Sequence, residues 1–228
     1  MKDAEQSKTK PVEQQPESTS FADVGAGMRR GFQIQHVESV EAKSRRAAAR
    51  LAEAAAREGL LDVAYGFADS PFGRLMVAVT PRGLVRLDYP DRDLDLSLQE
   101  LAAEVSQRIL EAPRATDDVR RELEEYFDGK RKRFTVRVDM SPLHGFRRKV
   151  LEQTARIPFG QVSTYAEVAV AAGSPRGMRA AGNALGSNPV PIVVPCHRVL
   201  RSGGGLGGYT GGLDRKVTLL TLEGVLEG

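Results

Sequence analysis

The strongest constraint on the fold is a run of helix start and stop signals in the stretch GQVSTYAEVAVAAGSPRGMRAAGNALGSNP. Thr164 and Glu167 have the spacing of a capping box, and Gly173 is suited to end that helix in a left-handed conformation. Ser174 then stands before Pro175, as an N-cap stands before a proline at the first helical position. The stretch therefore predicts a helix, a short turn and a second helix, which is the arrangement of a helix-turn-helix.

The second of these helices is expected to be slim and basic on one face. Arg176, Arg179 and Asn183 fall at positions i, i+3 and i+7, and the residues between them are mostly glycine and alanine. Such a helix can lie close to a phosphate backbone. The same residues would also suit the solvated face of an alanine-rich packing helix, and taken alone they leave both interpretations open.

The only cysteine of the chain lies in the segment NPVPIVVPCHRVL. Because Pro189, Pro191 and Pro195 cannot all serve as donors in a central sheet, this segment is expected to be constrained and not a ladder strand. It would then hold Cys196 and His197 in a fixed place. A lone cysteine is more often a small buried hydrophobe than a nucleophile, so the residue type by itself does not decide its role.

The residues before this region predict a small domain of strands and helices. LDVAYGF, RLMVAV and LVRLDY are strand-like and are separated by the turn sequences SPFG and TPRG, so an antiparallel meander is expected. Apolar spacing predicts helices in SLQELAAEVSQRILE, DDVRRELEEYFDG and GFRRKVLEQTARI. In RFTVRVD the apolar residues alternate, which predicts one more strand. Residues 1 to about 30 are expected to form a flexible tail, and 37–61 a helix of unassigned role.

Charge and cysteine content exclude some classes of protein. The chain has 33 basic and 30 acidic residues, a net charge of +3. From Ser141 onward ten Lys and Arg face five Asp and Glu, a net +5, so the residues before carry a net −2. This is a weak indication of an anionic partner for the second half. One cysteine excludes an intramolecular disulfide and suits a reducing compartment.

Other classes are disfavoured by what the sequence does not contain. No apolar run approaches the roughly 20 residues that span a bilayer, so a cytoplasmic protein without a membrane partner is expected. Cys196 with His36, His144 and His197 does not make a four-ligand zinc set, and no metal or cofactor is expected.

The motif PCHRV, preceded by NPVPIVV and followed by GGYTGGLDRK and LEG, resembles the active-site signature of the O6-alkylguanine-DNA alkyltransferases. These proteins are also called methylated-DNA-protein-cysteine methyltransferases. The resemblance runs from about Pro142 to the C-terminus, and the meander resembles the family's N-terminal domain more loosely. It implies an α/β (α+β) fold with a ribonuclease-H-like domain over 61–140 and a winged helix-turn-helix catalytic domain over 141–228. Residues 1–60, expected as a flexible tail and an alanine-rich helical extension, lie outside the resemblance.

The resemblance also implies the catalytic residues. Cys196 would accept the alkyl group, His197 would take its proton through a water, and Glu223 would orient that histidine. Tyr165 would donate a proton toward the departing guanine, and Asn188 would be the hinge between the recognition helix and the active-site segment.

The remaining roles concern DNA and the base. The resemblance implies that Arg179 fills the gap left in the duplex, and that Tyr165 helps to rotate the nucleotide. The other expected DNA-binding residues are Arg176, Ala180 and Gly182. The expected base pocket is formed by Val199, Tyr209, Thr210 and Leu185. The family often has serine where this chain has Thr210, which adds a methyl group at the pocket.

The chemistry requires these residue types. Displacement at an alkyl carbon needs a thiolate, and a free thiol with a pKa of about 8.5 is only a few per cent ionised near pH 7. A His–Glu pair supplies the base, and a phenol protonates the leaving base. With no second cysteine to resolve the thioether, each molecule is expected to act once. The target base must be extruded from the duplex, and the resemblance places the helix in the minor groove.

The expected substrate is O6-alkylguanine in double-stranded DNA, with O4-alkylthymine left open, and the protein is expected to be a monomer whose cooperativity on DNA is open. Three rival functions remain. A non-catalytic reader of alkylated DNA would not need Cys196. A cysteine hydrolase with a Cys–His–Glu triad would leave the basic helix without a purpose. A winged-helix repressor would leave PCHRV unexplained.

Overall fold

A computed structural model describes residues 43–44, 47–48, 50–52, 54–55 and 58–227. The tail expected over residues 1–30 lies outside the described residues, as does much of the helix expected over 37–61; its described residues from 43 to 55 are helical. Ala52 and Ala55 of this stretch pack with Leu61, Ala64 and Ala112. Nearly all the described residues belong to the compact unit that runs from Ala48 to Gly228.

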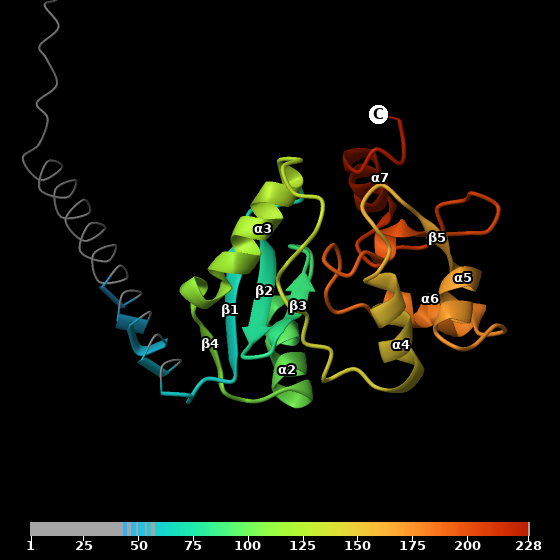
Figure 1. The fold of residues 1–228 in the computed structure, drawn as a ribbon. Helices are drawn as coiled ribbons and strands as arrows, with labels where there is room; N and C mark the ends of the chain where they lie inside the picture. Colours follow the sequence, from blue (N-terminus) through green and yellow to red (C-terminus); the bar gives the residue numbers. More distant parts are fainter. Residues whose placement is uncertain (1–42, 45–46, 49, 53, 56–57, 228) are drawn as a thin grey trace, which may run out of the picture. The chain divides into compact units, whose positions relative to one another are not determined.

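The N-terminal part of this unit is built on a four-stranded sheet (Figure 1). The expected meander is confirmed: β1 (Val63–Ala68), β2 (Leu75–Thr80) and β3 (Gly83–Asp88) pair antiparallel. The turn before β3 requires glycine, because Gly83 has φ +136° and a Cβ there would lie 2.3 Å from the Arg137 carbonyl oxygen. The fourth strand, β4 (Ile109–Glu111), pairs parallel with β1, so β3 is an edge of the sheet.

Two helices cover the two faces of the sheet. After a short 3₁₀ turn, η1 (Pro113–Thr116), α3 (Asp117–Phe127) packs through Val119 and Leu123 into a core that includes Leu75 and Val77. The other face is covered by α2 (Leu94–Glu104), whose Leu101 packs with other residues of β1, β2 and β3, namely Val63, Met76, Ala78 and Val85. The alternation of side chains along each strand therefore supplies two separate apolar clusters.

Two expectations for this part are wrong. The helix expected to run through SLQELAAEVSQRILE ends at Glu104, and Ile109 lies in β4, where burial against α2 and the sheet outweighs helical spacing. RFTVRVD forms no strand among the described residues and has only an isolated bridge, Leu84 to Val138. Its backbone is held differently, because the N–H groups of Thr135 and Val136 donate to the carboxylate of Glu122 on α3.

The C-terminal part contains four helices and a small parallel sheet. The helices are α4 (Gly145–Thr154), α5 (Tyr165–Ala171), α6 (Met178–Gly186) and α7 (Leu213–Leu222). The short strands β5 (Ser163–Thr164) and β6 (Val199–Leu200) pair parallel. The helix-turn-helix is confirmed: α5 packs against α6, Thr164 and Glu167 form the capping box, and Gly173 has φ +85°.

The start of the second helix differs from the expectation. α6 begins at Met178 with Gly177 as its N-cap, and no side chain caps it. Ser174 and Pro175 instead belong to a turn that the Ser174 carbonyl closes by accepting the Gly177 N–H at 2.8 Å. A Cβ on Gly177 would lie 2.6 Å from the Ser174 hydroxyl, so this turn needs glycine there. Arg176 is therefore exposed in the turn and does not share a helical face with Arg179.

The segment before the cysteine is constrained, as expected, and is not a strand. Ile192 has φ +72°, the only positive φ of a non-glycine residue in the described ranges. The segment meets the edge of the sheet, because the Leu87 N–H of β3 donates to the Pro189 carbonyl at 2.8 Å. One apolar core continues from Leu75 in the sheet to Cys196.

Candidate active site

The sulfur of Cys196 is held inside the protein by an amide. Cys196 begins the 3₁₀ turn η2 (Cys196–Arg198) and is 4% exposed. Asn188 Nδ2 donates to the sulfur at 3.1 Å and to the Val194 carbonyl at 2.8 Å, while Asn188 Oδ1 accepts the Val190 N–H. Burial raises the pKa of Cys196 to about 11, against the lowering effects of Asn188 and the charge of Lys216. The resting thiol is thus protonated and needs a base.

The adjacent histidine belongs to a buried ion network. His197 Nε2 lies 2.9 Å from Glu223 Oε1, and both side chains are fully buried. Arg198 holds the same carboxylate with two hydrogen bonds of 2.8 Å. Burial would raise the pKa of Glu223, but the hydrogen bonds from His197 and Arg198 hold it at about 2. Glu223 is therefore anionic at neutral pH.

The histidine itself is neutral and has a free ring nitrogen. Burial lowers the pKa of His197 below its usual 6.5, and Glu223 only partly offsets this. His197 Nδ1 is buried and has no hydrogen-bond partner within the described part of the chain. With Nε2–H directed to the anionic carboxylate, Nδ1 carries the lone pair that can accept a proton.

Cys196 lies at an open pocket of about 800 Å³ between α5, α6 and the loop over residues 201–212, called here the glycine-rich loop. Tyr165, the first residue of α5, reaches across it and donates to the Gly208 carbonyl at 3.2 Å. The structure brings three of the four expected base-pocket residues to this cavity, namely Leu185, Tyr209 and Thr210. The expected catalytic and DNA-binding residues that also line it are Tyr165, Arg179, Gly182 and Cys196. Met178 and Arg201 also line it, and no motif in the sequence predicted either residue at the site.

Some expected site residues lie elsewhere. Val199 is fully buried, is not among the pocket-lining residues, and accepts a hydrogen bond from Lys216 through its carbonyl. Ala180 is exposed on α6, and Arg176 is exposed in the turn before it, so neither lines the pocket. Thr210 lines the pocket but directs its hydroxyl to the Gly186 carbonyl at the end of α6, at 2.7 Å.

The glycine-rich loop is held in place by hydrogen bonds from a buried lysine. Lys216 of α7 is 0% exposed, and its ammonium donates to the carbonyls of Val199, Leu206 and Gly208. Burial lowers the pKa of Lys216 to about 8. This lysine ties the loop to β6. Spacing in the sequence does not reveal this, because the carbonyls come from backbone that any residue could provide.

Gly207→Ala should bring a methyl group into steric conflict with the Tyr165 phenol. Gly207 has φ +70°, and a Cβ there would lie 2.7 Å from the Tyr165 hydroxyl oxygen. The variant is expected to lose about 1–3 kcal/mol of folding free energy from backbone strain and to displace the Tyr165 phenol. Chemical unfolding would measure the first effect. Gly203→Ala, where a Cβ meets nothing within 4 Å, is the matched control and should be near wild type.

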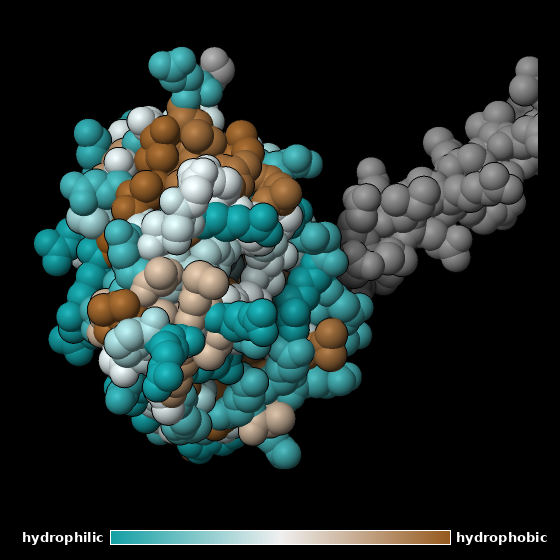
Figure 2. Space-filling model, turned by 90° about the vertical axis from the view of Figure 1, so that its right-hand side faces the viewer, coloured by the Kyte–Doolittle hydropathy of each residue, from teal (hydrophilic) through white to brown (hydrophobic). Residues whose placement is uncertain are grey.

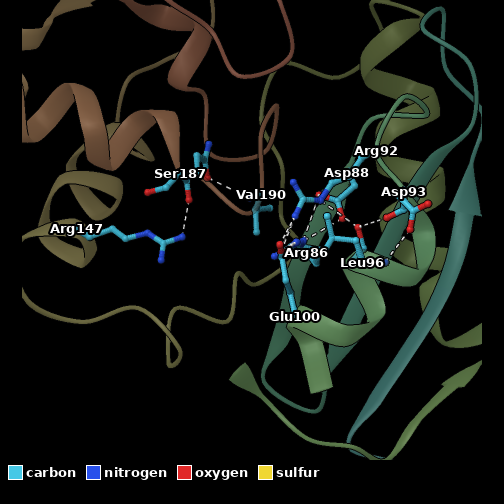
Figure 3. Close-up of polar contacts among 11 residues, drawn as sticks. Arg86, Asp88, Arg92, Asp93, Leu96, Glu100, Arg147, Ser187 and Val190 are labelled. Carbon is cyan, nitrogen blue, oxygen red and sulfur yellow. Dashed lines mark hydrogen bonds and ion pairs between the residues drawn. The ribbon is translucent and has the colours of Figure 1, made fainter. Parts of the chain in front are cut away.

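The end of α6 is anchored to neighbouring elements. Arg147 of α4 donates to the Ser187 carbonyl, one residue before Asn188 (Figure 3). At a second cavity of about 810 Å³, which Arg147 and Ser187 also line, Arg86 of β3 pairs with Asp88 and with Glu100 of α2 (Figure 3). The segment that carries Asn188 is thus held by Arg147 at Ser187 and by the Leu87 N–H of β3 at Pro189.

Figure 2 shows the side of the protein that carries α5 and α7. Hydrophobic residues gather in its upper part, at the height of α7. Below them hydrophilic residues predominate. Leu213 and Val217 of α7 are exposed.

No helix of the described ranges is long and apolar enough to span a bilayer. Within those ranges no three His, Cys, Asp or Glu side chains are grouped to bind a metal.

Two family models match the chain. The model for the ribonuclease-like domain of 6-O-methylguanine DNA methyltransferase matches residues 63–140, and the model for its DNA-binding domain matches residues 145–225. The two matches follow one another along the chain and leave its N-terminal extension uncovered.

Similar proteins carry the corresponding names. The methylated-DNA–protein-cysteine methyltransferase of Methanosarcina barkeri is 36% identical over 70% of this chain and 96% of its own length. That of Mycolicibacterium paratuberculosis is 38% identical over 71% of this chain and 92% of its own. Among solved structures, Mycobacterium tuberculosis OGT in complex with DNA is 34% identical, with a TM-score of 0.60 over 70% of this chain and 92% of that one.

Proposed function

Because this chain belongs to the 6-O-methylguanine DNA methyltransferase family, we propose that it repairs duplex DNA by transferring the alkyl group of O6-alkylguanine irreversibly to Cys196. The observation that carries this proposal is the position of the sole cysteine. Its sulfur lies at the pocket formed with Tyr165 and Arg179, directly beside the His197–Glu223 pair. A DNA-binding domain that presents a thiol in this way joins binding and chemistry in one site.

The proton path begins at the thiol. With the pKa of Cys196 raised to about 11, His197 must take the proton as the sulfur attacks. The unpartnered Nδ1 of His197 is the atom for this step, through a water, and the anionic Glu223 stabilises the imidazolium that results. Burial thus keeps the thiol inert until a substrate fills the pocket.

The transfer itself is a displacement at the alkyl carbon. A bond forms between sulfur and the carbon, and the bond from that carbon to guanine O6 breaks. The Tyr165 phenol, whose pKa burial raises, protonates the departing base and then regains a proton from solvent, while His197 releases the thiol proton to solvent. The proton lost by the thiol is thus balanced by the one gained by guanine. The product thioether has no second thiol to release it, so each molecule acts once.

The DNA contacts follow from the exposed residues of α6. Arg179 lies at the pocket mouth, where it would fill the gap left by an extruded nucleotide. Ala180 and Gly182 allow the helix to approach the minor groove closely, and Arg176 would contact a phosphate from the turn before it. We infer a division into a sheet domain over 61–140 and a catalytic domain over 141–228, in a monomeric cytoplasmic protein.

The function is tested by mass spectrometry after mixing the protein with a duplex that contains one O6-methylguanine. At equal concentrations the peptide with Cys196 should gain one methyl group, and with excess DNA repair should stop at one lesion per protein. A lesion reader would bind the duplex and leave the peptide unmodified. A hydrolase would turn over on an ester and leave the duplex unrepaired.

Arg179→Ala should slow transfer from duplex DNA at least about tenfold and leave transfer from free O6-methylguanine nearly unchanged, since extrusion costs a few kcal/mol that the free base does not require. Single-turnover rates on both substrates measure this. Arg176→Ala removes the same charge outside the helix and should weaken duplex binding without changing the ratio of the two rates. Equal losses on duplex and free base in Arg179→Ala would contradict the proposed role.

A further inference from the structure

A tyrosine of the sheet domain contacts the buried carboxylate of the site. Tyr126, on α3, donates its hydroxyl proton to Glu223 Oε1 at 2.7 Å. The tyrosine is 0% exposed and Glu223 is 4% exposed, so water does not compete for this hydrogen bond. The contact joins residues 97 positions apart in sequence.

The oxygen that Tyr126 contacts is the one that faces the histidine. Glu223 Oε1 lies 2.9 Å from His197 Nε2, and it also accepts a hydrogen bond from Arg198 Nη2 at 2.8 Å. The other oxygen accepts from Arg198 Nε. Three donors thus converge on one carboxylate oxygen. The phenol fixes the orientation of Glu223 and withdraws part of the negative charge that His197 experiences.

Packing does not require the hydroxyl. The Tyr126 ring lies among the rings of Phe127, Phe134 and Phe159, with centroids 5.3, 5.2 and 6.2 Å away. A fourth phenylalanine would fill this place equally well. Burial and the nearby Glu223 charge raise the pKa of Tyr126 far above its usual value, so the hydroxyl stays protonated and always donates. Among the described residues the hydroxyl bonds to the carboxylate of Glu223 alone.

We propose that Tyr126 is a positioning residue for alkyl transfer, which holds Glu223 toward His197 and limits the basicity that the carboxylate confers on the imidazole. The role in transfer rests on the proposed function, whereas the effect on His197 does not. The other groups that act on His197 are the cations Arg198 and Lys216, and the Tyr209 ring packs edge-on at 6.3 Å.

Tyr126→Phe in the full chain is the test. Without the phenol, Glu223 Oε1 carries more charge and stabilises the imidazolium, so the pKa of His197 should rise. We expect a rise of about half a unit, measured by ¹⁵N NMR of the ring nitrogens, which is about threefold in proton affinity. Methyl transfer from free base and from duplex should slow about fivefold near neutral pH, with an unchanged Kd for duplex DNA. The acid limb of the pH–rate profile should move to higher pH with the His197 titration.

Two controls separate this role from a structural one. Tyr65→Phe removes a half-buried phenol of the same domain that packs on Phe67, and it should change neither the titration nor the rate. In the Glu223→Gln background, adding Tyr126→Phe should slow transfer no further. A folded Tyr126→Phe protein that loses only thermal stability, with a wild-type His197 titration and wild-type rates, would overturn the inference. A wild type that accepts no methyl group would refute the proposed function instead, while the His197 titration would still decide the contact.

Discussion

Cys196→Ala is expected to bind duplex DNA as tightly as the wild type and to repair none of it. The sulfur is the only acceptor in the chain, and alanine removes it without altering the DNA-binding face of α6. Loss of a single γ atom in the core should lower the folding free energy only slightly, so the variant should stay folded while it loses all transfer. The measurement is repair of an O6-methylguanine duplex, followed by digestion and chromatography, beside a Kd from fluorescence anisotropy.

Serine provides the matched variant for this experiment. Cys196→Ser keeps the size of the side chain and the hydrogen bond from Asn188, but its hydroxyl is a much weaker nucleophile than a thiolate. It too should bind and not repair. Any methyl group transferred to the protein in either variant would show that another residue is the acceptor.

Glu223→Gln is expected to impair both stability and transfer. Arg198 is 6% exposed and loses the one carboxylate that pairs with it in the described part of the chain, which leaves a buried charge unpaired and costs about 3–5 kcal/mol of unfolding free energy. His197 loses the anion that stabilises its protonated form, so single-turnover transfer should slow by about 10²–10⁴-fold. Urea unfolding and rapid-quench kinetics measure the two effects.

A second substitution separates them. In the double variant Glu223→Gln with Arg198→Met the unpaired charge is gone, so much of the stability should return while transfer stays slow. If the rate returned together with stability, Glu223 would act only through folding. The wild type gives a related pH dependence. Because the pKa of Glu223 is lowered from its usual 4.5 to about 2, its contribution to stability is complete above pH 4.5 and is lost as the pH falls toward 2.

Local signals in the sequence predicted the fold best where they act within one turn of chain. Thr164 and Glu167 satisfy each other directly, so the capping box predicted α5 correctly. Ser174 and Pro175 carry an equally good signal for a helix start, but they form a tight turn with Gly177, and α6 begins only at Met178. Ile109 keeps helical spacing and still lies in a strand, because its place is decided by packing against the sheet.

The site could be predicted only as far as its motif extends. Cys196 and His197 are adjacent, and the resemblance supplied Glu223, which the structure places at the histidine. The structure adds two buried groups that complete the site. Arg198 forms an ion pair with Glu223, and Lys216 hydrogen-bonds to backbone carbonyls of the glycine-rich loop and β6. Neither role follows from sequence spacing, because each depends on a partner brought close only by the folded chain.

The apolar core described above includes side chains from both regions that the family models match separately. Leu75 of β2 and Leu123 of α3 belong to the same cluster as Val150 of α4 and Leu219 of α7. The cluster under α2 lies within the N-terminal region alone, whereas the core on the α3 side of the sheet is shared with the C-terminal helices. We therefore expect the two regions to unfold in one cooperative transition, and the two fragments of a chain cut between them to be less stable apart than in the whole protein.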